Sequence, residues 1–282
     1  MGFWKSLFTG SEEKQEDNQR KEEKNFDILK FDGVRAQRMG RLDYALRCFD
    51  EALNLKEDFE TLSFKSSALI SLNRLDEAQE VLERMTELEP QLVDVRIALT
   101  NILYMTEQYD AMKTAAMKAV ECDAQNPLAY FLQGRAEDSL GQLDSATESL
   151  TKAIELRPDF IEARNLRAEV SLKAGQTAQA MDDIKEVLAL NSEEETALYL
   201  RAHIYHTVTG DMEKAKADYR HLIEIDPFHK EAYTGLLAIL KAEGNEEEAK
   251  KLEEEAAALN IDNEDMPNYA IGGMEKRDVL GL

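Results

Sequence analysis

The chain has 282 residues, a formal net charge of −23 and 43% hydrophobic residues. This apolar fraction is large enough for a buried core and disfavours general disorder, while only 13 glycines and 5 prolines argue against an all-β protein rich in turns. With 32% charged residues, the composition instead favours helices with solvated outer faces. The negative net charge repels phosphate backbones, so we do not expect the protein to bind nucleic acid.

The N-terminal segment, residues 1–25, combines a short apolar stretch with a charged linker. Its four large apolar residues would line one side of an amphipathic helix: Phe3, Trp4, Leu7 and Phe8. Residues 9–25 have no large apolar side chain, which is typical of a solvated linker or a fraying helix. Three interpretations stay open: a tip that is disordered or docks on the following repeat, an anchor for a membrane or a partner, and a myristoylation signal.

A repeat of about 34 residues extends over residues 26–262. Its mark is a short segment, such as Gly40-Arg-Leu-Asp-Tyr-Ala45, that recurs seven times. The last residues of the seven copies are spaced 33, 34, 34, 34, 35 and 34 apart: Ala45, Ala78, Met112, Ala146, Ala180, Ala215 and Ala249. Seven copies at nearly constant spacing indicate a repeat architecture.

Each copy predicts two short helices joined by tight turns. The Gly or Asn that begins the segment ends one helix, where a left-handed residue is needed. The Asp or Glu that usually follows three residues later lies near the positive N-terminal end of the next helix. Apolar residues at helical spacing come next, for example Ala146, Leu150 and Ala153. Prolines such as Pro158 then end the second helix.

Small residues recur in the first helix of successive copies, 12 residues before the small site of the second helix: Gly33, Ser66, Thr100, Gly134 and Ala168. Small side chains on both helices let them approach at the short end of the ~8–10 Å packing range. The same count places His203 at this site in the sixth copy and Leu237 in the seventh. One hairpin cannot bury its own apolar face, so neighbouring hairpins must stack.

The period, the Gly-x-Leu/Tyr-Asp-x-Ala core, the paired small sites and the terminal prolines resemble the tetratricopeptide repeat. The resemblance implies an all-α, right-handed superhelical solenoid of about seven helix-turn-helix repeats over residues 26–262. A C-terminal tail, residues 263–282, would either be flexible or fold back onto the array. Among the internal repeats the third departs most from the pattern, because Thr100 and Met112 occupy its two small-residue sites. We therefore expect this repeat to unfold locally more easily than the others.

In the family, the inner, concave wall of the solenoid comes from the first helices. The resemblance therefore implies a protein-interaction scaffold or adaptor that binds a peptide or partner protein in this groove. Asn can pair with a peptide backbone and Arg with a carboxylate, which suits an extended peptide or a short helix. The apolar residues of this wall can instead pack between repeats. The middle of the wall is expected to present Ile97, Asn101, Tyr104, Phe131, Arg135, Asn165, Glu169, Leu200, Arg201 and Ile204.

The sequence contains no glycine-rich phosphate loop, Gly-x-Ser-x-Gly elbow or His-Glu-x-x-His pair. His203 and His206 could share a helix face and bind a metal, but no third ligand type completes a site, so a structural role is favoured. We predict a non-catalytic protein without cofactor or metal. The alternative function is a self-assembling or membrane-proximal scaffold that uses the N-terminal aromatic residues.

Two features of the sequence bear on its cellular location. It has only two cysteines, Cys48 and Cys122, which fits a reducing compartment. It has no apolar run of about 18 residues or more, the length that a membrane-spanning helix needs. We therefore expect a cytoplasmic protein.

Overall fold

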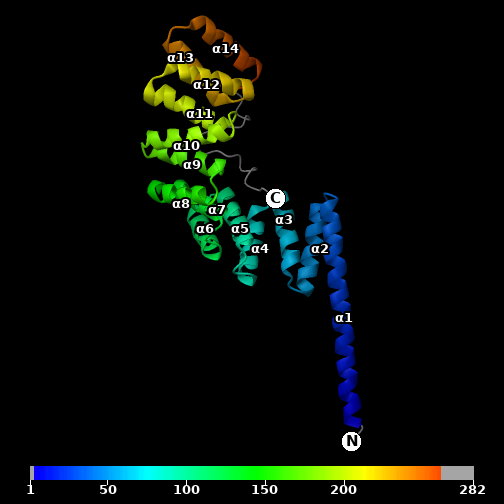
Figure 1. The fold of residues 1–282 in the computed structure, drawn as a ribbon. Coiled ribbons are helices and arrows are strands. Elements are labelled where there is room, and N and C mark those ends of the chain that lie inside the picture. Colours follow the sequence, from blue (N-terminus) through cyan, green and yellow to red (C-terminus); the bar gives the residue numbers. More distant parts are fainter. Residues whose placement is uncertain (1–2, 262–282) are drawn as a thin grey trace. The chain divides into compact units, whose positions relative to one another are not determined.

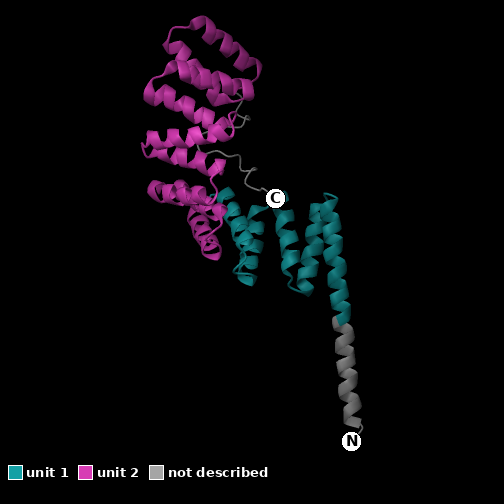
Figure 2. Ribbon diagram, viewed as in Figure 1, with its two compact units in different colours: residues 1–108 teal, residues 109–282 magenta. Residues whose placement is uncertain are grey.

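The computed structural model describes the backbone of residues 3–261 and the side chains of residues 20–261. All regular elements in this range are helical, with fourteen α-helices and one short π-helix (Figure 1). The chain divides into two compact units, residues 1–108 and 109–282 (Figure 2). The division falls between the two helices of the third repeat, and the predicted C-terminal tail lies outside the described residues.

Unit 1 contains five helices: α1 (Phe3–Arg38), α2 (Leu42–Leu55), α3 (Phe59–Ser71), α4 (Leu75–Leu88) and α5 (Val93–Met105). Helices α1 and α2 pack as one hairpin and α3 and α4 as the next, while α2 and α4 contact the first helix of the following repeat. This arrangement confirms the expected stacking of hairpins within the unit.

Unit 2 contains nine α-helices and the π-helix: α6 (Tyr109–Cys122), α7 (Pro127–Ser139), α8 (Leu143–Leu156), α9 (Ile161–Lys173), α10 (Thr177–Leu190), α11 (Glu195–Ile204), the π-helix (Tyr205–Thr209), α12 (Met212–Ile225), α13 (Lys230–Ala242) and α14 (Glu246–Ala258). Four hairpins follow α6, and each second helix packs against the first helix of the next hairpin. The all-α fold of helix-turn-helix repeats is therefore confirmed.

The turn inside each hairpin contains the left-handed residue that the sequence predicts. The backbone angle φ is 71° at Gly141 and 56° at Asn73, residue types that tolerate this conformation. The third repeat has Glu107 at the same place, with φ of 60°. A β-carbon makes that conformation strained, by roughly 1–2 kcal/mol. The weakest copy of the sequence pattern therefore also has the least suitable turn residue.

The small residues of the first helices allow the close approach that the sequence predicts. A β-carbon built on Gly134 would lie 2.7 Å from Cγ of Leu150 on α8, and one on Gly33 would lie 2.5 Å from the ring of Phe49 on α2. Both partners are fully buried. The small first-helix residue therefore leaves room for a large apolar side chain of the second helix.

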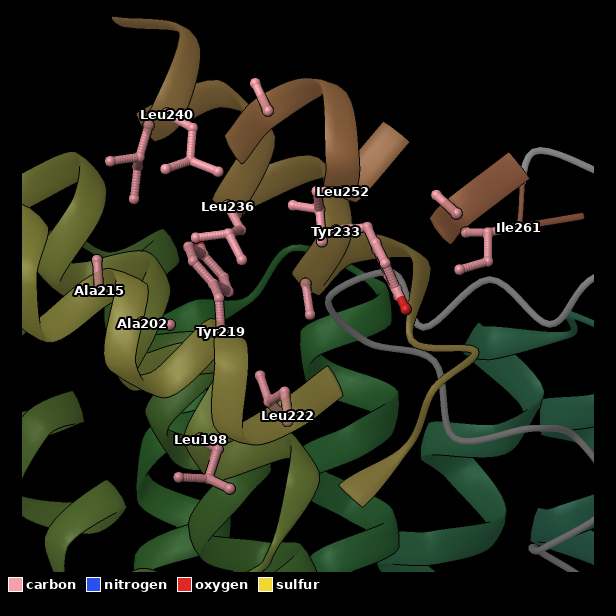
Figure 3. Packing of buried hydrophobic residues seen from close by; sticks show 14 residues of the cluster. Leu198, Ala202, Ala215, Tyr219, Leu222, Tyr233, Leu236, Leu240, Leu252 and Ile261 are labelled. Carbon is pink, nitrogen blue, oxygen red and sulfur yellow. The ribbon is translucent and has the colours of Figure 1, made fainter. Parts of the chain in front are cut away.

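The sixth repeat corrects one prediction. Its small site is occupied by Ala202, which is 0% exposed and belongs to the same buried cluster as Ala215 and Tyr219 (Figure 3). His203 is only half-buried. The reason is the π-helix Tyr205–Thr209, whose wider turn accommodates one extra residue between the two small sites. Counting back 12 residues from Ala215 therefore gives a position that is one residue too late.

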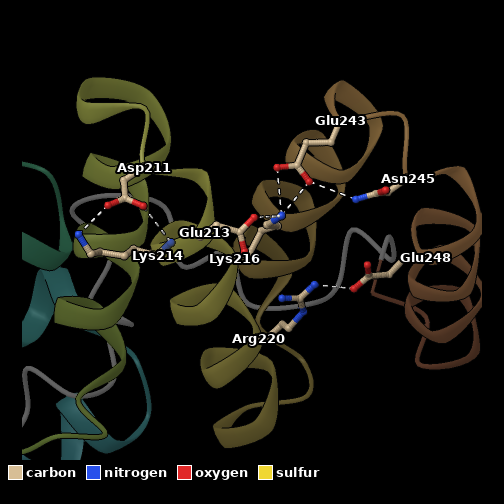
Figure 4. Close-up of polar contacts among 8 residues, drawn as sticks. All are labelled: Asp211, Glu213, Lys214, Lys216, Arg220, Glu243, Asn245 and Glu248. Carbon is tan, nitrogen blue, oxygen red and sulfur yellow. Dashed lines mark hydrogen bonds and ion pairs between the residues drawn. The ribbon is translucent and has the colours of Figure 1, made fainter.

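Ion pairs join the last two hairpins of unit 2 (Figure 4). Lys216 on α12 is 6% exposed, and its Nζ lies 2.7 Å from Glu213 Oε1 and 2.8 Å from Glu243 Oε2. Arg220, also on α12, pairs with Glu248 on α14 at 2.5 Å. A buried ammonium needs such partners because an unpaired buried charge is strongly destabilising.

Helix α1 runs without a break from Phe3 to Arg38. The backbone of the predicted amphipathic segment and charged linker is thus continuous with the first helix of the first repeat. Phe26, at the predicted start of the array, is only 5% exposed. The predicted anchor residues lie in α1, but their side chains are outside the described part of the chain: Phe3, Trp4, Leu7 and Phe8. Their role as an anchor stays a prediction.

We expect amide protons of residues 94–123, in the third repeat, to exchange with solvent faster than those of residues 127–156, in the fourth. The strained Glu107 turn lowers the local free energy of opening, and repeat arrays open where one unit is weak. Native-state hydrogen exchange measures this difference directly. Glu107→Gly should reduce it, since glycine relieves about 1 kcal/mol of strain. Equal protection of the two repeats would contradict the prediction.

Candidate partner-binding site

The first helices of unit 2 form a row in which α7 contacts α9 and α9 contacts α11. Residues four apart on a helix share a face, and one such pair recurs every 34 residues along this row. We call these six residues the first-helix face: Phe131 and Arg135 on α7, Asn165 and Glu169 on α9, Tyr199 and His203 on α11.

Phe131 and Arg135 form the α7 part of the face. The Phe131 ring lies 5.0 Å from the ring of Phe160, which immediately precedes α9. The Arg135 guanidinium lies 4.4 Å from the centre of the Phe131 ring, in cation–π contact. Both side chains are buried, at 5% and 7% exposure. This part of the face is therefore closely packed and carries a positive charge.

Asn165 connects α9 to the beginning of α11. Its Nδ2 donates a hydrogen bond to Glu194 Oε1 at 2.9 Å, and Glu194 Oε2 accepts from the Ala197 backbone N–H at 2.6 Å, which caps α11. Asn165 is 8% exposed, and its Oδ1 is buried without a hydrogen-bond partner among the described residues. Buried polar atoms nearly always have a partner, so this acceptor is unusual.

Glu169 follows one helical turn later and is 6% exposed. Its Oε2 is also a buried acceptor without a hydrogen-bond partner in the described part of the chain. Burial raises the pKa of this carboxyl to about 7, and the nearby carboxylate of Asp138 acts in the same direction, while Lys173 opposes the shift. Lys173 itself binds Asp138 at 2.8 Å and so links α9 to α7.

Tyr199 lies between two imidazoles on the α11 part of the face. Its ring centre is 6.1 Å from that of His203 and 5.7 Å from that of His229, the residue before α13. Burial raises the pKa of Tyr199 and lowers the pKa values of both histidines. Both imidazoles are therefore neutral at pH 7 and add no positive charge to the face.

The structure corrects the residues expected from the sixth repeat. Leu200 and Ile204 are 0% exposed and belong to a core cluster with Ala168 and Ile184, so they present no surface to a partner. Arg201 points to the second helix of its own hairpin, where it binds Asp218 at 2.8 Å. Leu200 and Ile204 thus pack between the fifth and sixth hairpins, and Arg201 faces α12.

Tyr199 and His203 are the residues that the sequence analysis missed in this repeat. They follow Asn165 and Glu169 by 34 residues each, and this spacing was the signal that could have identified them. A first-helix position that is counted back from Ala215 on the second helix is one residue too late, because the π-helix adds a residue after His203.

The remaining predicted wall residues belong to unit 1. Ile97, Asn101 and Tyr104 all lie on α5, and each is half-buried. Like Oδ1 of Asn165, Asn101 Oδ1 is a buried acceptor without a hydrogen-bond partner among the residues that the structure describes. Binding through these three residues stays a prediction.

Two kinds of feature are absent from the described residues. No three His, Cys, Asp or Glu side chains among them are arranged to hold a metal ion. None of their helices combines the length and the apolar character that crossing a membrane requires.

Comparison with known proteins supports the repeat assignment. The tetratricopeptide repeat model matches residues 59–92, 128–160 and 195–229. The chain is 24% identical to the DnaJ homolog subfamily C member 3 of Gallus gallus over 196 residues, which cover 70% of this chain and 35% of that protein. The chain therefore matches only about a third of the length of this relative.

Solved structures share the fold. A tetratricopeptide repeat protein from Parabacteroides merdae superposes with a TM-score of 0.61 at 18% identity, covering 71% of this chain and 79% of that one. YrrB, described as a tetratricopeptide protein with an unusual peptide-binding site, superposes with a TM-score of 0.53 at 23% identity, covering 65% and 95%. Together with the hairpins, these likenesses show that the chain has the fold of tetratricopeptide repeat proteins, and three of its repeats match the model of that family.

Proposed function

We propose that the protein is a non-catalytic interaction scaffold that binds a peptide or a partner protein along the first-helix face. The observation that carries this proposal is the pair of buried acceptors on α9, Asn165 Oδ1 and Glu169 Oε2, which have no hydrogen-bond partner among the described residues. An unsatisfied buried acceptor costs about 1–3 kcal/mol. A partner that donates hydrogen bonds to this face recovers that free energy on binding.

The half-buried Tyr199 beside these acceptors supports the same role. Tyrosine supplies a large contact area with little loss of conformational entropy, and it is enriched among the residues that dominate binding energy. The peptide-binding site reported for YrrB shows that this fold can bind peptides, which is consistent with the proposal.

The combined variant Asn165→Ala, Tyr199→Ala is expected to lose the specific partners of the wild-type protein. Loss of a dominant contact costs about 2 kcal/mol or more, which corresponds to roughly 30-fold in affinity. Quantitative affinity purification from the native cells, followed by calorimetry with each identified partner, measures the effect.

The matched control is Asp182→Ala, Lys185→Ala, which removes an exposed ion pair on α10. This control should retain all partners, because its side chains are 78% and 64% exposed and lie away from the first-helix face. Unchanged partners and affinities in the Asn165, Tyr199 variant, with its helical content preserved, would refute binding at this face.

A further inference from the structure

Acidic groups surround the α9–α11 part of the first-helix face. The negative charges of Asp138 and Glu194 are close enough to Glu169 to disfavour its ionised form. Likewise, the charges of Glu169 and Glu231 disfavour the ionised form of Tyr199. The acidic surroundings continue at the beginning of α11 and the end of α12, where Glu195 interacts with Asp226.

Several of these carboxylate oxygens lack a donor. Glu169 Oε2, Asp226 Oδ2 and Glu231 Oε2 are all buried without a hydrogen-bond partner in the described range. Glu231 Oε2 lies 3.5 Å from His229 Nδ1. That nitrogen accepts the backbone N–H of Ala232, so it has no proton to donate to the carboxylate. The first-helix face, together with the nearby Asp226 and Glu231, therefore offers acceptors and negative charge in excess of the donors around them.

The nearby positive charges do not balance this set. The cations that act on Glu169 are Arg135 and Lys173. Lys173 binds both oxygens of Asp138 at 2.8 Å, and the Arg135 guanidinium stacks on Phe131. The two histidines beside Tyr199 have lowered pKa values and stay neutral. An anionic ligand, such as an acidic or phosphorylated peptide, would be repelled here.

A cationic side chain fits these features. Ammonium and guanidinium groups donate several hydrogen bonds and accept none, and they bind carboxylates strongly. The Tyr199 ring adds an aromatic surface that attracts a cation held over it. Asn165 and Glu169, with exposures of 8% and 6%, supply buried acceptors on the neighbouring helix α9.

Resting on the proposed function, we propose that this face binds a basic segment of the partner, with a lysine or arginine side chain placed against Tyr199 and hydrogen-bonded to Asn165, Glu169 and Glu231. The remaining carboxylates, Glu194 and Glu195, attract neighbouring basic residues of the same segment. Charge complementarity thus selects a basic peptide over neutral or acidic ones.

The test uses the full chain and three fluorescein-labelled peptides of equal length, built from alternating Arg-Ala, Gln-Ala and Glu-Ala. Fluorescence anisotropy at pH 8 and physiological salt measures their affinities. We expect the Arg-Ala peptide to bind and the other two not to bind. Glu169→Gln combined with Glu231→Gln should weaken the Arg-Ala peptide by roughly tenfold or more, because both groups pair with the bound cation.

The charge-matched control is Glu247→Gln, Glu254→Gln on α14, whose side chains are 88% and 69% exposed. It reduces the net negative charge by the same two units, so any effect of the general acidic field appears in both variants. We expect less than about a twofold change in this control. An equal loss in both variants, or no preference for the Arg-Ala peptide, would overturn the inference.

The two proposals fail in different ways. If partner capture depends on Asn165 and Tyr199 but the face shows no preference for the basic peptide, the choice of a basic ligand is wrong and the scaffold function stands. If capture is unaffected by the Asn165, Tyr199 variant, the proposed binding face is wrong and the basic-ligand inference falls with it.

Discussion

Glu169→Gln is expected to stabilise the folded protein in a pH-dependent manner. Burial raises the pKa of Glu169 from 4.5 to about 7. The unfolded chain therefore releases this proton at lower pH than the folded protein does, and the wild type loses stability as pH rises from about 4.5 to about 7. Glutamine stays neutral in both states. The variant should be more stable by about 1 kcal/mol at pH 5.5 and by about 3 kcal/mol above pH 8.

Urea unfolding followed by circular dichroism between pH 5.5 and pH 8.5 measures this difference and stays above the isoelectric point of about 4.6. The control is Glu186→Gln on α10, an exposed residue. It should change the free energy of unfolding by less than about 0.5 kcal/mol at every pH. A stabilisation by Glu169→Gln that does not increase with pH would show that the carboxyl is not held neutral by burial.

Leu150→Ala is expected to lower the free energy of unfolding by about 2–5 kcal/mol. Leu150 is 0% exposed and fills the space beside Gly134, so its truncation leaves a cavity between α7 and α8. Gly134→Ala alone should cost about 1–3 kcal/mol, because its β-carbon would lie 2.7 Å from Cγ of Leu150.

The double variant Gly134→Ala, Leu150→Ala should lose less than the sum of the two single variants, by about 0.5–3 kcal/mol. The new methyl group then occupies space that the leucine has left. Urea unfolding of all four proteins provides the measurement, and Leu190→Ala, at a 54% exposed position on α10, serves as a control for loss of apolar volume. Strict additivity would mean that the two side chains do not share this space.

The hairpins of this protein were predictable because the features that define them are local in sequence. A glycine such as Gly141 ends one helix, and Leu150 and Ala153 follow it at helical spacing. The stacking of hairpins was predictable as well, since no hairpin buries its apolar face alone. The candidate site was predictable only in part, and Asn165 and Glu169 are the clearest examples of correct placement on a first helix.

The sixth repeat shows why the rest was not predictable. The 35-residue spacing reveals that one residue is added before Ala215, but it does not say where. The backbone hydrogen bonds of the π-helix Tyr205–Thr209 decide this, and they leave Ala202 in the core and His203 beside Tyr199. A count along the sequence that assumes uniform helices instead selects Leu200 and Ile204.

The sequence alone therefore determined the repeat, its period and the positions of its turns, because each depends on residues within one copy. Only the tertiary structure decided which polar groups lose their contact with water. Glu169 and Asn165 look like ordinary helix residues in the sequence, and their burial and unsatisfied acceptors arise from neighbouring repeats packed against α9. Desolvation depends on what surrounds a group in space, and that surrounding comes from residues about 34 positions away.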